Sequence, residues 1–431
     1  MSGGKLERYA TYKDSGIEWL GEVPSNWIVT RNKDIFFERG SLSQSGDEML
    51  LTVSHITGVT RRSEKNVNMF MAETMEGYKH CKTGDLIINT MWAWMGALGT
   101  AREDGICSPA YGVYAPRNGM PYSHRYFDYL YRTPKAVSEM TRNSKGIVSS
   151  RLRLYPKDFF QISTALPDCF EQTAIATYLD KKTAQIDREV DLLSKKTIHY
   201  GLLRQSLINE LVTRGLDKST PMKDSGVEWI GDVPEGWNIF RVKDLASSIN
   251  GGAFKDDLVD SGLPIIKIQQ LTLNNEATDF CDPKSSKLKS GNLLKAGDLV
   301  FSWSTLIAPF IYKGKDAALN QHIFKITHSH RTHRGWLFYK LSQSVSRLLV
   351  FAHGSTMQHI LKSDFDNLEI ETPPLAEQVA IATYLDEKTA QIDRIVSAVN
   401  SKIEKLKDLR KALISDAVTG KITVVSEGQA S

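Results

Sequence analysis

The side chains of this chain that can do chemistry are dispersed, and none of their clusters has the spacing of a catalytic or metal site. The nearest approach to a metal site is the group His328, His330 and His333. No acidic residue or cysteine completes this set of ligands. Arg331 and Arg334 lie among the histidines, which favours an exposed basic loop. The sequence therefore predicts no metal site and no catalytic residue.

Loops that bind phosphates or cofactors are also missing. No GxxxxGK[ST] segment is present for ATP. A methyltransferase needs a glycine-rich turn for its cofactor and an Asn/Asp-Pro-Pro-aromatic loop around a flipped base. The closest match, TPPL at residues 372–375, lacks both ends of that loop. Asp256 and Asp257 lack the following carboxylate and lysine of a metal nuclease, so we expect turn residues there.

Length and composition indicate an ordinary globular protein with two or three domains. The 431 residues are 41% hydrophobic and 24% charged, and the net charge of +4 permits a nucleic-acid partner without indicating one. The N-terminal residues lack an apolar targeting segment, and the apolar run 86–98 is too short to span a bilayer. We therefore expect a cytoplasmic protein with no membrane partner. The four cysteines form no close pair and suit a reducing compartment: Cys81, Cys107, Cys169 and Cys281.

Residues 373–421 have the pattern of one long helix. Pro373 and Pro374 open the segment, where a first helical turn tolerates a missing N–H, and Gly420 closes it, where a left-handed residue ends a helix. Two rows of mostly apolar residues recur every seven positions, which is the pattern of a coiled coil. A helix of about 45 residues spans on the order of 65 Å. Such a helix needs a partner along its length.

The expected partner lies in the same chain. Residues 171–188 repeat as residues 377–394, with differences only at Thr173/Val379 and Lys181/Glu387. We expect the two helices to pair with one row of side chains in their seam: Leu179, Ile186, Leu193, Leu207, Leu385, Ile392, Val399, Leu406 and Leu413. A simpler alternative is a non-catalytic coiled-coil scaffold that binds other proteins, and it predicts no sequence-dependent affinity for DNA.

A box of Gly, Pro and Trp residues marks the start of each half of the chain. Residues 12–27 (YKDSGIEWLGEVPSNW) recur as residues 222–237 (MKDSGVEWIGDVPEGW). We expect a turn-rich segment in which Trp19 and Trp27 pack against a domain. The order box, variable domain, long helix occurs twice, which indicates a tandem duplication. The expected boundaries are 1–166 and 217–372 for the boxes with their domains, 167–216 and 373–421 for the helices, and 422–431 for the tail.

The two variable stretches, 28–166 and 238–372, share only a few short matching segments. Residues 83–87 (TGDLI) match 296–300 (AGDLV), and the glycine-led segment 146–151 matches 354–359. Short β-branched runs bounded by turn residues predict strands, as at 263–268, 298–303 and 322–326. Residues 124–140 and 336–351 have the apolar spacing of a helix laid on that sheet. We expect two α+β domains that recognise two different things.

This layout resembles the specificity subunit of Type I restriction-modification systems. The resemblance covers nearly the whole chain and rests on the repeated box KDSGxEWxGxVPxxW and on the PPLAEQ segment at residues 373–378. Residues 166–170 (LPDCF) depart from that segment before the first helix. The fold implied is α+β: two mixed α/β target-recognition domains separated by two long antiparallel coiled-coil helices, with a pseudo-two-fold internal repeat.

The resemblance also implies a function and partners. Each domain would bind one half of an asymmetric, bipartite target in double-stranded DNA, and the helices would set the spacing. Two methyltransferase subunits would dock on the helices, and motor-nuclease subunits would complete the complex. S-adenosylmethionine, ATP and Mg²⁺ would bind those partners, so this chain would carry no cofactor and no activity.

Candidate DNA contacts follow from residue types that read base edges or phosphates from loops. In the first domain they lie in the stretches 55–65 and 144–153: His55, Arg61, Arg62, Lys65, Lys145, Ser149, Ser150 and Arg151. In the second domain they are Lys267, Gln269, Gln270, Trp303, Ser304, Asn320, Gln321, His322, Ser355, Thr356, Gln358 and His359. The alternative for each is a solvated loop or a polar group that caps the sheet. We expect Trp92 and Trp94 to be core residues.

Overall fold

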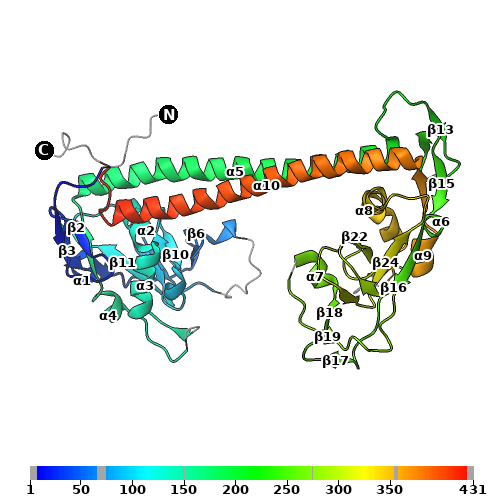
Figure 1. Ribbon diagram of the computed structural model, residues 1–431. Coiled ribbons are helices and arrows are strands. Elements are labelled where there is room, and N and C mark those ends of the chain that lie inside the picture. Colours follow the sequence, from blue (N-terminus) through cyan, green and yellow to red (C-terminus); the bar gives the residue numbers. More distant parts are fainter. Residues whose placement is uncertain (1–6, 66–73, 149–150, 274, 354–357, 425–431) are drawn as a thin grey trace. The chain divides into compact units, whose positions relative to one another are not determined.

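The computed structural model describes residues 7–65, 74–148, 151–273, 275–353 and 358–424 (Figure 1). The chain divides into two compact units, residues 1–194 with 401–431 and residues 195–400. Each unit holds one α+β domain and a half of each long helix. None of the described helices is long and apolar enough to cross a membrane.

The long helices are α5 (Cys169–Arg214) and α10 (Leu375–Val418), which lie side by side and antiparallel (Figure 1). In the first unit, Asp187 of α5 pairs with Arg410 of α10 at 2.9 Å. In the second unit, Arg204 of α5 lies 3.8 Å from Asp393 of α10. All nine side chains of the predicted seam are buried or half-buried. The predicted pair of antiparallel helices is therefore correct.

Each box joins a recognition domain to both helices. The first box is the ribbon β1 (Tyr12–Asp14) and β2 (Glu22–Pro24), and the second is β13 (Met222–Asp224) and β14 (Asp232–Pro234). Trp27 Nε1 donates to Glu171 Oε1 at 3.3 Å, at the start of α5. Trp237 Nε1 donates to Glu377 Oε2 at 3.0 Å, at the start of α10. Both tryptophans are almost fully buried, so the box is a structural element.

The opposite helix ends against the same box. Gly420, just beyond α10, lies so close to Pro24 and Trp27 that a Cβ would collide with the proline ring. Gly215, just beyond α5, lies equally close to Glu377 and Trp237. Both glycines have positive φ, 73° and 76°, which favours residues without a side chain. Each box therefore holds the start of one helix against the end of the other.

The glutamine after each of these glutamates fixes the recognition domain. Gln172 Nε2 donates to the carbonyls of Pro121 and Pro167, both at 3.0 Å, and its Oε1 accepts from Ser123 N at 2.7 Å. Gln378 makes the equivalent three hydrogen bonds in the second unit. Both amides are buried with both ends satisfied. The repeated Glu-Gln pair thus ties box, domain and helix together.

The first domain is built on a four-stranded sheet of order β4-β11-β8-β9, and β3 pairs with β12 beneath the helices. Its elements, in chain order, are β3 (Ile28–Arg31), α1 (Asn32–Ile35), β4 (Phe36–Glu38), β5 (Leu51–Ser54), β6 (Gly58–Arg61), η1 (Arg62–Glu64), β7 (Lys79–Cys81), β8 (Leu86–Asn89), η2 (Ala93–Met95), β9 (Leu98–Thr100), β10 (Gly105–Cys107), β11 (Tyr111–Pro116), α2 (His124–Tyr131), α3 (Pro134–Arg142), α4 (Pro156–Phe159) and β12 (Ser163–Leu166).

The second domain repeats this plan with the sheet β16-β24-β21-β22, and it adds a five-stranded sheet of order β17-β19-β18-β23-β20. Its elements are β15 (Asn238–Arg241), α6 (Val242–Leu245), β16 (Ala246–Asn250), β17 (Leu258–Val259), β18 (Leu263–Ile266), α7 (Ile268–Leu273), β19 (Phe280–Cys281), β20 (Leu293–Leu294), β21 (Leu299–Ser302), β22 (Ala308–Ile311), β23 (Ala317–Leu319), β24 (Ile323–His328), α8 (Arg334–Val350), α9 (Lys362–Asp366) and β25 (Glu369–Thr372).

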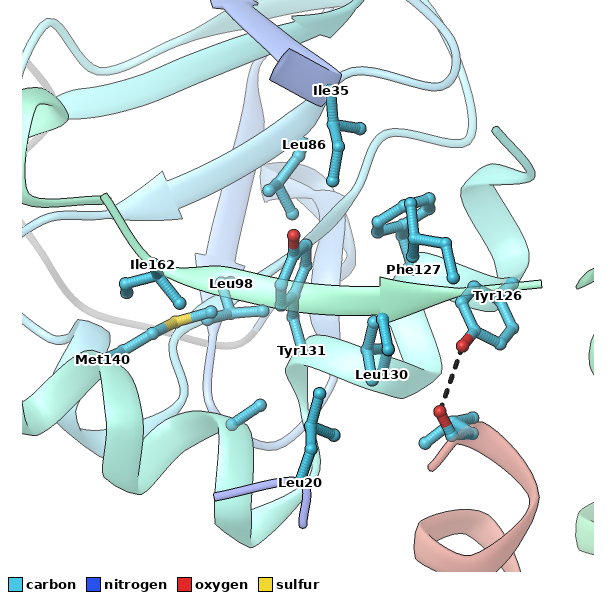
Figure 2. Close-up of a cluster of buried hydrophobic side chains, with 14 of the residues drawn as sticks. Leu20, Ile35, Leu86, Leu98, Tyr126, Phe127, Leu130, Tyr131, Met140 and Ile162 are labelled. Carbon is cyan, nitrogen blue, oxygen red and sulfur yellow. Dashed lines mark hydrogen bonds between the residues drawn. The ribbon is translucent and has the colours of Figure 1, made fainter. Parts of the chain in front are cut away.

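The single helix predicted at 124–140 is wrong, because the segment forms two helices, α2 and α3. Pro134 cannot continue a helix, and Thr133 caps the next one by accepting from Ala136 N at 3.3 Å. Figure 2 shows Leu86, Leu98, Phe127 and other buried side chains of this core packed together, with Tyr126 beside the end of α10. The Tyr126 hydroxyl donates to the Val418 carbonyl at 3.0 Å.

The two domain cores differ at one buried pair. In the second domain, Lys340 of α8 and Glu371 of β25 form an ion pair with exposures of 1% and 3%. Burial lowers the pKa of the Lys340 ammonium, and Glu371 Oε2 has no hydrogen-bond partner among the described residues. The equivalent residues of the first domain are Leu130 and Ala165, both buried. The same site therefore holds an ion pair in one half and an apolar pair in the other.

We expect Lys340→Leu alone to lower the free energy of unfolding by about 3–5 kcal/mol, because the Glu371 carboxylate stays buried without a counter-charge. The double variant Lys340→Leu/Glu371→Ala reproduces the first domain's pair, and its free energy of unfolding should lie within about 1 kcal/mol of the unsubstituted protein or above it. Denaturant titration of the three proteins checks this. A double variant as unstable as the single one would contradict it.

Candidate nucleic-acid interface

The two domains present equivalent edges at the end of their central strands, β8 and β21. Each strand begins after a Gly-Asp turn in which the carboxylate accepts from a backbone N–H three residues earlier: Asp85 from Lys82 at 2.7 Å, and Asp298 from Lys295 at 2.8 Å. This turn fixes the register of the strand. Equivalent positions therefore reach the far end of the strand in both domains, and Thr90 corresponds to Trp303.

In the second domain, three predicted segments meet at this edge. Trp303 N donates to His322 O at 3.3 Å, and Ile360 N donates to Trp303 O at 2.9 Å. Thr305 N donates to Gln358 O at 3.1 Å, and Thr305 has a φ of 62° in this tight turn. The structure thus gathers Trp303 and Ser304 with Asn320, Gln321 and His322, and with Gln358 and His359. Ser304 itself is buried, and Ser355 and Thr356 lie outside the described residues.

Two ring nitrogens at this edge have no hydrogen-bond partner among the described residues. The rings of Trp303 and His322 lie 5.3 Å apart, and Trp303 also stacks on Phe324 at 6.0 Å. Trp303 Nε1 and His322 Nδ1 are enclosed and make no hydrogen bond within the described ranges. Enclosed polar nitrogens normally have a partner. This edge is therefore suited to a ligand that carries polar groups.

The candidates near 267–270 adjoin the same edge. Asn320 N donates to Ile266 O at 3.0 Å, which places the end of β18 beside Asn320. Lys267 forms an ion pair with Asp279 and lowers the pKa of that carboxyl. Gln270 Oε1 accepts from Lys267 N at 3.1 Å and so stabilises the start of α7. Gln269 is exposed, so it is the most accessible of the three predicted side chains.

In the first domain, the hairpin 145–153 occupies the place of 353–359. Lys145 N donates to Arg153 O and Arg153 N to Lys145 O, both at 2.9 Å, and Leu154 N donates to Thr90 O at 3.0 Å. Lys145 Nζ lies 3.0 Å from Asp158, whereas Arg151 is exposed. Ser149 and Ser150 lie outside the described residues. The predicted match of 146–151 with 354–359 lies mostly outside the described residues, and at its end Arg153 rather than Arg151 takes the place of His359.

The stretch 55–65 is not the single loop that we expected. Residues Gly58–Arg61 form β6, which pairs with β5, because Val59 packs with Leu51 and Val53 of β5 in a small core. His55 is exposed in the turn of this hairpin, and Arg62 and Lys65 lie at its opposite end. Arg61 is held by Glu103 through hydrogen bonds of 2.7 and 2.6 Å. Burial and the charge of Arg62 lower the pKa of Lys65.

Sequence reasoning missed Trp92. The expectation that it belongs to the core is wrong, because 49% of its surface is exposed, although Trp94 is half-buried. Trp92 follows Thr90 in the turn after β8, where it corresponds to Thr305. An alignment of the two Gly-Asp-Leu segments, extended by seven residues from Asp85 and Asp298, could have revealed this correspondence.

The histidine group of the sequence has a structural role at one position. His333 Nδ1 accepts from Trp336 N at 3.4 Å at the start of α8, and burial lowers the pKa of its imidazole. No group of three or more potential metal ligands occurs among the described residues.

Residues 234–405 match the family model of the Type I restriction modification DNA specificity domain. The chain is 26% identical to the MjaVIII specificity subunit of Methanocaldococcus jannaschii over 62% of this chain and 64% of the relative. It is 28% identical to the EcoKI specificity subunit of Escherichia coli over 45% of each chain. These matches span less than two thirds of each relative.

These matches point to the family of Type I specificity subunits. Solved structures show the same fold. A chain from a study of complex assembly and conformational transition in the type I R-M system superposes with a TM-score of 0.70 at 17% identity, covering 93% of this chain and 99% of the other. The HsdS subunit of Thermoanaerobacter tengcongensis gives 0.56 at 17% identity, covering 93% and 98%. The predicted fold is confirmed, and the sequence matches agree with the predicted family.

Proposed function

We propose that this specificity subunit binds double-stranded DNA and that each domain binds one half of an asymmetric, bipartite target. The observation that carries the proposal is the pair of equivalent edges with different side chains. The first edge carries Trp92 and a basic hairpin with Arg151, and the second carries Gln321 and His322. A shared framework with different polar and apolar groups suits the recognition of two different base sequences.

In this proposal the helices α5 and α10 set the distance between the two half-sites and provide docking sites for two methyltransferase subunits. The chain itself performs no catalysis. S-adenosylmethionine binds the methyltransferase subunits, and ATP and Mg²⁺ serve restriction motor-nuclease subunits. The repeated Glu-Gln junctions support this arrangement, because they hold each domain on the helix pair through buried hydrogen bonds.

The proposal predicts that this chain, co-purified with the methyltransferase encoded beside it, directs adenine methylation to one split motif. Single-molecule mapping of methylation on a random-sequence DNA library measures this. The methyltransferase alone is the control and should give no motif. The same methylation with and without this chain would instead support the coiled-coil scaffold.

Two arginines of the first domain should differ in their effect on DNA binding. Arg151 makes no ion pair within the described ranges. We therefore expect Arg151→Ala to weaken binding to all DNA sequences by the same factor. It should also flatten the slope of log affinity against log salt by about 0.9. Arg61→Ala is the matched control, because Glu103 already holds that guanidinium. Titrations from low to high salt measure both slopes, and equal slopes for the two variants would contradict the assignment.

A further inference from the structure

The exposed position of Trp92 is unusual for its residue type in this chain. All eight tryptophans lie in the described ranges, and Trp92 is the most exposed of them. Trp27, Trp237 and Trp336 are almost fully buried. An indole ring in water forgoes on the order of 2 kcal/mol of burial free energy. The fold leaves this ring exposed to solvent although the next residue, Ala93, belongs to the buried core of the domain.

The turn that carries Trp92 is rigid. Trp92 N donates to Asn89 O at 3.0 Å, and Ala97 N donates back to Trp92 O at 3.1 Å. The next residues form η2, in which Ala93 is fully buried and Trp94 Nε1 donates to Met91 O at 3.0 Å. Ala93 and Trp94 therefore anchor the residues that follow the exposed ring. The outward orientation of Trp92 follows from this backbone.

The surroundings of Trp92 suit a nucleic acid. Thr90 Oγ1 donates to Ala110 O at 2.9 Å, and Thr90 O accepts from Leu154 N at 3.0 Å. These bonds place the turn beside the basic hairpin of Lys145, Arg151 and Arg153. Positive charges next to an exposed aromatic ring are a common arrangement for binding DNA, because the charges hold phosphates and the ring meets bases.

The apolar face of the ring favours one kind of base recognition. Indole has one N–H donor, no acceptor and a large apolar face. In the major groove, the apolar feature that distinguishes one base from another is the thymine methyl group. We infer that Trp92 determines specificity in the first half-site by packing its ring against a thymine methyl group. This inference rests on the proposed function and adds a residue and a base to it.

The described part of the second domain has no equivalent ring at this position. Thr305 occupies the corresponding position, and the nearby Trp303 is turned inward onto Phe324. Its edge offers polar side chains instead. The thymine contact thus belongs to the first half-site alone, and a change at Trp92 should leave the second half-site untouched.

The test compares the full complex carrying the unsubstituted chain, Trp92→Ala or Trp92→Phe by methylation mapping. Trp92→Ala should relax the motif in one half only, with about tenfold less discrimination at one position, and Trp92→Phe should retain part of it. Ile28→Ala removes another exposed apolar side chain of this domain and is the control. The thermal midpoints of all variants should agree.

Binding of DNA with uracil in place of thymine at the relaxed position then tests the methyl contact. Uracil should weaken binding of the unsubstituted complex several-fold and of Trp92→Ala less than twofold. An unchanged motif in Trp92→Ala, or an equal loss with uracil in both proteins, would overturn the inference and leave the proposed function standing. No bipartite motif from the unsubstituted complex would overturn both.

Discussion

The buried contact between a box tryptophan and the first glutamate of a long helix is the constraint on which the rest of this structure depends. The indole N–H of Trp27 or Trp237 donates to a carboxylate, which is buried at Glu171 and half-buried at Glu377. A hydrogen bond to a charged group contributes about 1.5–3 kcal/mol. The glycine that ends the opposite helix packs on the same ring. One residue therefore fixes where both helices meet the domain.

This constraint explains which parts of the duplication stayed alike. The Glu-Gln pair and the box tryptophan recur because equivalent hydrogen bonds hold them in both units. Away from that junction the two halves diverged freely. Leu130 and Ala165 stand where Lys340 and Glu371 form an ion pair, and the second domain gained an extra sheet. The Glu-Gln pair and the box fix each domain on the helices. The edges at the ends of β8 and β21 differ without disturbing that contact.

The sequence predicted the framework well and the edges less well. Heptad spacing and internal repetition report packing directly, so the helix pair, its seam and the α+β domains were predictable. The break at Pro134 was visible in the sequence but was outweighed by the apolar spacing around it. The hairpin 55–65 was missed because Val59 and its neighbours form a strand too short for its alternation to stand out. Trp92 was misjudged because residue type predicts burial, whereas its exposure depends on the turn that Ala93 and Trp94 anchor.

The central claim is that helices of fixed length, held at both ends by the boxes, set the distance between two half-sites. Removing seven residues from each helix, 192–198 and 399–405, keeps the heptad register and shortens the pair by roughly 10 Å. The spacer of the methylation motif is the measurement. The account predicts that both half-sites persist and that the spacer shortens by about three base pairs, at roughly 3.4 Å each. Two unchanged half-sites at the original spacing would contradict it.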